Sequence, residues 1–142
     1  MSPIQSNTIE GLMAFTADGD LTGKEGYLVK LTTGTDGKAE VKLPTDVADV
    51  SPYVIIDVPE ASYTAGDKVY VEPLTSGKQV RLIAAGTITA GDRVLLSGTF
   101  GKVISETGAG ADAYWSPGYA EEDAASGGYV AVRYYPAAVT VS

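Results

Sequence analysis

The chain of 142 residues contains neither cysteine nor histidine. Without cysteine it can form no disulfide, no thiolate nucleophile and no cysteine-ligated metal site. Without histidine it lacks the commonest general base and the commonest transition-metal ligand, which excludes Ser-His-Asp chemistry and histidine-ligated zinc within one chain. An enzyme built on this sequence would depend on carboxylates, lysine, tyrosine, serine and threonine.

Basic residues are also scarce, because 10 Lys and Arg stand against 18 Asp and Glu and give a net charge of −8. Such a charge repels nucleic-acid phosphates and anionic membrane surfaces, so we expect neither as a partner. The longest apolar runs, such as residues 54–56, are far too short to span a bilayer. The N-terminus lacks the basic flank and apolar run of a secretory signal, so we expect a soluble protein made in the cytoplasm.

The residues that are plentiful favour strands joined by tight turns. The chain has 17 Gly, 7 Pro and 9 Tyr, and no segment keeps a helical period over three turns. We therefore predict a mainly β protein, a small β-barrel or β-sandwich-like single domain built from β-hairpins over residues 10–142. Residues 1–9 are predicted to form an extended N-terminal arm.

Alternating segments and turn signals place the strands of this domain. One hairpin is expected over residues 27–44 with Asp36-Gly37 at its tip, and further strands at 10–15, 53–59, 67–74, 78–85, 91–97, 102–106 and 129–142. Residues 107–128 are rich in Gly, Ala and Ser. They are predicted to form a long loop, with a short helix at 119–125 as the alternative.

One segment of the sequence occurs twice with small changes. Residues 63–80 read "YTAGDKVYVEPLTSGKQV", residues 88–103 read "ITAGDRVLLSGTFGKV", and a looser copy spans residues 21–43. Each copy predicts a turn, a strand, a tight turn with Gly-Lys, and a returning strand. Within the first turn, Gly66 and Gly91 suit a positive φ, and Asp67 and Asp92 suit hydrogen bonds from nearby backbone N–H groups.

The same aspartates admit a catalytic or metal-binding interpretation. Two turn carboxylates that met would make an acid–base pair or an oxygen-ligand ion site, as in a carboxylate-based hydrolase or lyase using Asp67 or Asp92. Turn chemistry already explains both residues, so the structural interpretation is favoured. The Gly-rich residues 108–112 lack the ending of a phosphate-binding loop, and residues 18–23 lack the closing glutamate of a calcium loop. No catalytic residue, metal site or cofactor is predicted.

Aromatic residues gather near the C-terminal end, and they suit either a β core or a protein interface. A glycan-binding or adhesion module on a phage or cell surface is an alternative in which exposed Trp115 and Tyr114 stack on sugar rings. The candidates for a contact between protomers are Tyr114, Trp115, Tyr119, Tyr134 and Tyr135.

The unit at residues 88–103, the turn and strand at 22–31 and the ending "GYVAV" at 128–132 together resemble the capsid cement or decoration proteins of tailed bacteriophages. The resemblance covers about residues 10–135, and residues 107–128 depart from the pattern. It implies a non-enzymatic β-barrel-like module that binds the outer surface of an assembled shell, often at threefold positions, and stabilises it against internal DNA pressure. The implied partners are the major capsid protein and further copies of the chain, as a homotrimer or a dimer. The implied location is the virion, after synthesis in the host bacterial cytoplasm.

On this interpretation the N-terminal arm contacts the shell by adding a strand to an exposed sheet edge of the coat protein. The predicted capsid-binding residues are Ser2, Pro3, Ile4, Gln5, Ser6, Asn7 and Thr8.

Overall fold

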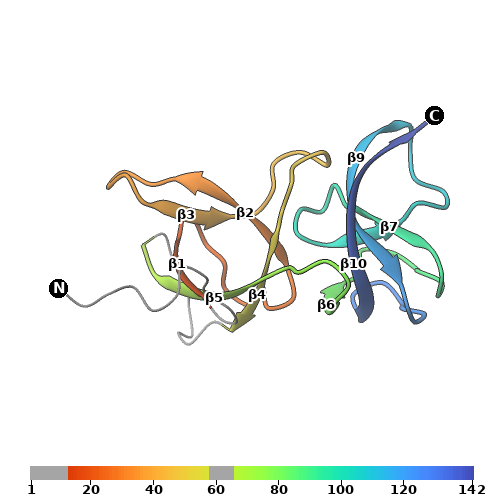
Figure 1. Cartoon of the computed structure of the whole chain (residues 1–142), viewed down its shortest axis with the longest axis horizontal. Helices are drawn as coiled ribbons and strands as arrows, with labels where there is room; N and C mark the ends of the chain where they lie inside the picture. Colours follow the sequence, from red (N-terminus) through yellow and green to blue (C-terminus); the bar gives the residue numbers. More distant parts are fainter. Residues whose placement is uncertain (1–12, 58–65) are drawn as a thin grey trace.

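The computed structural model describes residues 13–57 and 66–142, and every regular element in them is a β-strand (Figure 1). This confirms the mainly β prediction. The predicted arm, residues 1–9, lies outside the described residues, and the assignment of residues 10–142 to a single domain stays a prediction. The strands are β1 (Met13–Ala17), β2 (Leu28–Thr33), β3 (Ala39–Lys42), β4 (Tyr53–Asp57), β5 (Lys68–Pro73), β6 (Gln79–Ile83), β7 (Arg93–Leu96), β8 (Val103–Ser105), β9 (Asp112–Ala120) and β10 (Tyr129–Val141).

The first five strands close into a barrel in the order β1-β3-β2-β4-β5. Strand β1 closes it, because it pairs antiparallel with β5 and parallel with β3. Alternation along each strand fills the interior: in β5, Val69 and Val71 are buried while Lys68 and Tyr70 point outward. The barrel core consists of Ala17, Leu21, Val29, Val41, Ile55, Val69 and Val71.

The last five strands form a second sheet in the order β6-β10-β9-β7-β8. This sheet curls until its two edges approach, since Ala84, just after β6, forms a bridge with Val103 of β8. Its core also includes Leu28 and Val54 from two barrel strands. The barrel and the second sheet therefore form two lobes that share buried apolar contacts (Figure 1).

The repeated unit folds in two ways. The copy at residues 88–103 forms the β7–β8 hairpin, and the looser copy forms the β2–β3 hairpin around Asp36-Gly37, so both predicted hairpins are confirmed. The hairpin predicted for residues 63–80 is wrong, because β5 belongs to the barrel and β6 to the second sheet. Pro73 has no N–H for continued pairing and ends β5, after which the N–H of Gly77 donates to the carbonyl of Tyr134 in the second sheet.

The loop predicted at residues 107–128 is also wrong, because β9 occupies Asp112–Ala120 and no helix forms there. Every residue from Tyr114 to Gly118 is buried, so this strand shows no alternation of apolar and polar residues. Its small residues are needed for close packing: a Cβ on Gly118 would lie 1.9 Å from the carbonyl oxygen of Arg133. The composition that indicated a loop therefore reflects a strand whose middle, residues 114–118, is buried on both faces.

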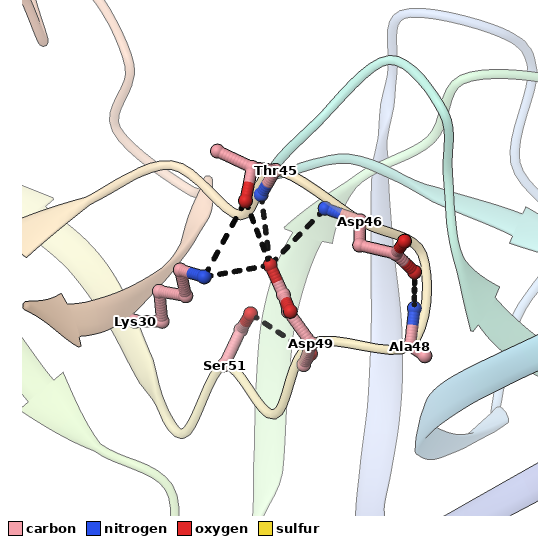
Figure 2. A network of polar contacts seen from close by, with 6 residues as sticks. All are labelled: Lys30, Thr45, Asp46, Ala48, Asp49 and Ser51. Atoms are coloured by element: carbon pink, nitrogen blue, oxygen red, sulfur yellow. Dashed lines mark hydrogen bonds and ion pairs between the residues drawn. The ribbon is translucent and has the colours of Figure 1, made fainter.

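A loop of the barrel contacts the second sheet directly. The backbone N–H of Trp115 in β9 donates a 2.8 Å hydrogen bond to the carbonyl of Val47, between β3 and β4. Asp49 fixes this loop, since its Oδ2 accepts from Lys30 Nζ at 2.8 Å and from the N–H groups of Thr45 and Asp46 at 2.9 and 3.1 Å (Figure 2). Partial burial acts to raise the pKa of Asp49, but the hydrogen bonds from Lys30 and the backbone outweigh it and hold the pKa below its ordinary value.

Residues 13–57 and 66–142 contain no helix that could cross a lipid bilayer.

Candidate interaction surface

The two Gly-Asp corners stand at the start of strands in different sheets. Gly66 and Gly91 have φ of +95° and +92°, the left-handed region that favours glycine. Asp92 Oδ2 accepts hydrogen bonds from the Thr89 N–H at 3.1 Å and from Ser105 Oγ at 2.7 Å. At the other corner, the Asp67 carbonyl accepts from the Ala17 N–H at 2.8 Å. Asp67 thus precedes β5 of the barrel, whereas Asp92 precedes β7 of the second sheet, so the two residues belong to separate turns.

No group of three or more carboxylates in the described part of the chain could hold a metal ion.

Three of the five aromatic residues predicted for a protomer contact belong to the interior. Trp115 is 4% exposed, Tyr134 7% and Tyr114 8%, and the Trp115 and Tyr134 rings lie 6.4 Å apart. Stacking of sugar rings on Trp115 and Tyr114 is therefore wrong as an expectation, since neither ring presents a face to solvent. Tyr119 and Tyr135 are 40% and 50% exposed and remain available for a contact.

A row of side chains crosses four strands on the outer face of the second sheet. Arg93 of β7 pairs with Tyr119 of β9, Tyr119 pairs with Arg133 of β10, and Arg133 pairs with Gln79 of β6. Directly paired residues of neighbouring strands project from the same face of a sheet. The four side chains therefore form one continuous line.

Four more residues extend this row. Tyr129 and Ala131 alternate with Arg133 along β10 and so share its face, and Arg81 of β6 pairs with Ala131. The Tyr135 hydroxyl lies next to Gly77, whose carbonyl accepts a hydrogen bond from Arg133. The face thus holds all three arginines of the chain and three exposed tyrosines. We name it the Arg–Tyr face: Arg81, Arg93, Arg133, Tyr119, Tyr129 and Tyr135.

Contacts within the Arg–Tyr face hold its long side chains in place. The Arg93 guanidinium lies 4.3 Å from the Tyr119 ring centroid and donates to Ser116 Oγ at 3.1 Å and to the Tyr119 hydroxyl. Arg81 lies 5.7 Å from the centroid of Tyr129. Such contacts are cation–π interactions, and they present each guanidinium in a defined position.

Arg133 is the arginine of this face that has a carboxylate partner. Its Nη2 lies 2.8 Å from Glu121 Oε1, which also accepts a 2.9 Å hydrogen bond from Gln79. The hydrogen bonds from Gln79 and Arg133 hold the pKa of Glu121 below its ordinary value.

The sequence alone indicated Tyr119 and Tyr135 as candidates for a contact between protomers, but it did not indicate the arginines. Each arginine follows or precedes a buried valine or leucine in a strand, as in "QVRLI", "RVLL" and "AVRY", which places all three on the solvent side. This alternation predicts that the three arginines are exposed. It does not predict that they lie near one another, because that depends on the order of the strands in the sheet.

Carboxylates gather at the opposite lobe. Asp18 follows β1, Asp36 lies at the tip of the β2–β3 hairpin, and Glu40 lies in β3. Partial desolvation, together with the negative charges of Asp18 and Asp36, raises the pKa of Glu40. We name these three residues the acidic barrel end.

A groove of about 320 Å³ lies where the barrel meets the second sheet. Its walls include Val54 of β4, Leu74 after β5 and Tyr134 of β10. Burial raises the pKa of the Tyr134 phenol, so this group is a neutral hydroxyl at the groove.

These features define a class: a small all-β protein of a closed barrel and a curled sheet. No protein-family model matches this sequence, and no curated protein matches it. Among solved structures, the chain is similar in fold to the N base of the head fiber protein gp8.5 of bacteriophage phi29. The TM-score is 0.66 over 88% of this chain and 95% of that one, with 20% sequence identity. A likeness at this identity shows a shared fold.

Proposed function

We propose that this chain is a non-enzymatic structural protein of a phage virion that binds the outer surface of the assembled capsid and stabilises it. The observation that carries the proposal is the fold shared over nearly the whole length with the base of a phage head fiber. It agrees with the resemblance of the repeated turn-and-strand units to capsid decoration proteins. The proposed partners are the major capsid protein and further copies of this chain, as a homotrimer, with a dimer as the alternative.

The described surface supports a binding role. The Asp92 carboxylate is occupied by turn hydrogen bonds, and the Arg–Tyr face presents the residue types that are enriched at the centres of protein interfaces. A glycan-binding role loses its support because Trp115 and Tyr114 are buried.

A decorating protein stabilises a shell through mass action. Any protein that binds the assembled state more tightly than free coat subunits shifts the equilibrium toward the assembled state. Several copies joined in one oligomer would bind with higher avidity than one copy, without any single strong contact. On this proposal the arm residues 2–8 contact the shell.

Co-sedimentation with heads assembled without this chain tests the proposal. The full chain is expected to sediment with the heads, and a variant lacking residues 2–8 is expected to bind more weakly while keeping the melting temperature of the full chain. Equal binding by the truncated variant would contradict the role of the arm. Absence of binding by the full chain would contradict the proposed function.

A further inference from the structure

Charge is distributed unevenly between the two lobes. The described barrel residues, 13–57 and 66–73, include ten carboxylates and five lysines, whereas residues 74–142 include six carboxylates and five basic residues. The arginines all lie on one face of the second lobe, and the acidic barrel end lies on the first. The Arg–Tyr face thus concentrates three arginines, one of them paired with Glu121, whereas the acidic barrel end concentrates three carboxylates.

The Arg–Tyr face has unused capacity for a partner's carboxylates. Only Arg133 of its three arginines forms an ion pair within residues 13–57 and 66–142, so Arg81 and Arg93 have none there. Both guanidiniums are already positioned over tyrosine rings. Docking against them would cost less side-chain entropy than docking against free side chains.

The acidic barrel end has the complementary property. The Asp18 N–H donates to the Val41 carbonyl at 2.9 Å, which places Asp18 beside Glu40, and partial desolvation together with repulsion from the charges of Asp18 and Asp36 raises the pKa of Glu40. A cation placed against them would relieve that repulsion.

We propose that the Arg–Tyr face is the docking surface for the acidic barrel end of a second copy of this chain. The contact is heterologous, since two different surfaces meet, and a heterologous contact that closes on itself produces a ring. Closure after three copies gives the proposed homotrimer. The inference rests on the self-association in the proposed function and specifies the surfaces that carry it.

Charge and apolar area have separate roles in this contact. Exposed ion pairs contribute little affinity and mainly set orientation and partner choice. The exposed rings of Tyr119, Tyr129 and Tyr135 supply the area that leaves water. We therefore expect association that weakens as salt concentration rises, without being abolished.

Charge reversal on each surface separately tests the inference. Arg81→Glu changes an exposed arginine on the face, and Glu40→Lys changes the acidic barrel end, with Asp18→Lys as a second variant of the same charge change. Lys102→Glu is the control for Arg81→Glu, because it makes the same change of charge between β7 and β8, where Lys102 Nζ lies 5.6 Å from the Tyr27 ring and belongs to neither surface. Sedimentation velocity over a concentration series measures self-association without any capsid, and circular dichroism checks that each variant folds.

Each reversal is expected to weaken self-association about tenfold or more, while Lys102→Glu stays within about twofold of the native chain. Mixing Arg81→Glu with Glu40→Lys should restore association, because the native face of one variant meets the native barrel end of the other. Failure of the mixture to associate, or association unaffected by either reversal, would overturn the inference, as would a native chain that stays monomeric. Capsid binding is measured separately, so a monomer that still decorates heads would overturn this inference and leave the capsid role standing.

Discussion

The backbone N–H of Trp115 donates a 2.8 Å hydrogen bond to the carbonyl of Val47, and it thereby joins the second sheet to the barrel. A second bond crosses the same boundary, from the Leu28 N–H to the Gly101 carbonyl at 2.9 Å. Both involve backbone groups of loops, so the position of each lobe depends on the shape of a loop in the other. The loop that presents Val47 takes its shape from Asp49 (Figure 2).

Asp49→Ala is expected to lower the free energy of unfolding by about 1–3 kcal/mol at pH 7, since one oxygen accepts from Lys30 and two backbone N–H groups. Urea unfolding measures the change. Because the pKa of Asp49 is lowered in the folded protein, its contribution is present above the unfolded pKa of about 4 and is lost as pH falls through the folded pKa. The difference between native chain and variant should therefore shrink in acid.

Asp46→Ala is the control for that experiment, because the exposed Asp46 carboxylate accepts one bond, from the Ala48 N–H at 2.8 Å. A smaller loss, about 0.5–1 kcal/mol, is expected. Equal losses for the two variants would show that Asp49 has no special role in the loop.

Gly118→Ala is expected to cost about 4 kcal/mol or more, because its Cβ would lie 1.9 Å from the Arg133 carbonyl and disrupt the β9–β10 pairing. Gly108→Ala also places a side chain at positive φ, +83° against +147° at Gly118, but in open space, and should cost about 1 kcal/mol. Thermal unfolding of both variants measures the contrast. Similar melting temperatures would contradict the close packing at Gly118.

Glu40→Gln is expected to raise the melting temperature at pH 7. Partial desolvation and the charges of Asp18 and Asp36 raise the pKa of Glu40, so its ionised form opposes folding. That penalty is absent below the unfolded pKa and develops as pH rises through and above it, so the gain from Gln should vanish near pH 3. A gain of the same size at pH 3 and pH 7 would show that charge is not its cause.

Asp92→Ala is expected to destabilise the chain by about 1–2 kcal/mol, because its carboxylate accepts from the Thr89 N–H and from Ser105 Oγ. Ser105→Ala removes one of those partners. In a double-mutant cycle by urea unfolding, the two losses should be less than additive, since both changes remove the same bond. Strict additivity would mean that the Asp92–Ser105 bond contributes nothing to stability.

The sequence predicts the features that depend on neighbouring residues, and it fails for those that depend on contacts between distant segments. The alternation around Val69 and Val71 is local, as is the turn chemistry of Asp36-Gly37, and both predict structure correctly. The partner of β6 is not determined locally. The copies at 63–80 and 88–103 have similar sequences, but only tertiary packing determines that β6 pairs with β10. Strand β9 was missed because the small residues around Gly118 reflect contact with another strand.

The Arg–Tyr face could not be predicted from the sequence for the same reason. Sequence identifies Tyr119 and Tyr135 as aromatic residues near the C-terminus, and it equally identifies Trp115 and Tyr134, which the fold buries. The arginines come from β6, β7 and β10, far apart along the chain, and become neighbours of Tyr119 and Tyr129 only when those strands pair. A surface assembled across strands depends on topology, which no short motif contains.

Titration of heads assembled without this chain, followed by counting bound copies after density-gradient separation, tests the central claim most directly. A virion structural protein that decorates the capsid should saturate at a fixed number of copies per head, with a sharp plateau. Heads recovered from the gradient without bound chain, or binding that rises with concentration and never saturates, would contradict the account.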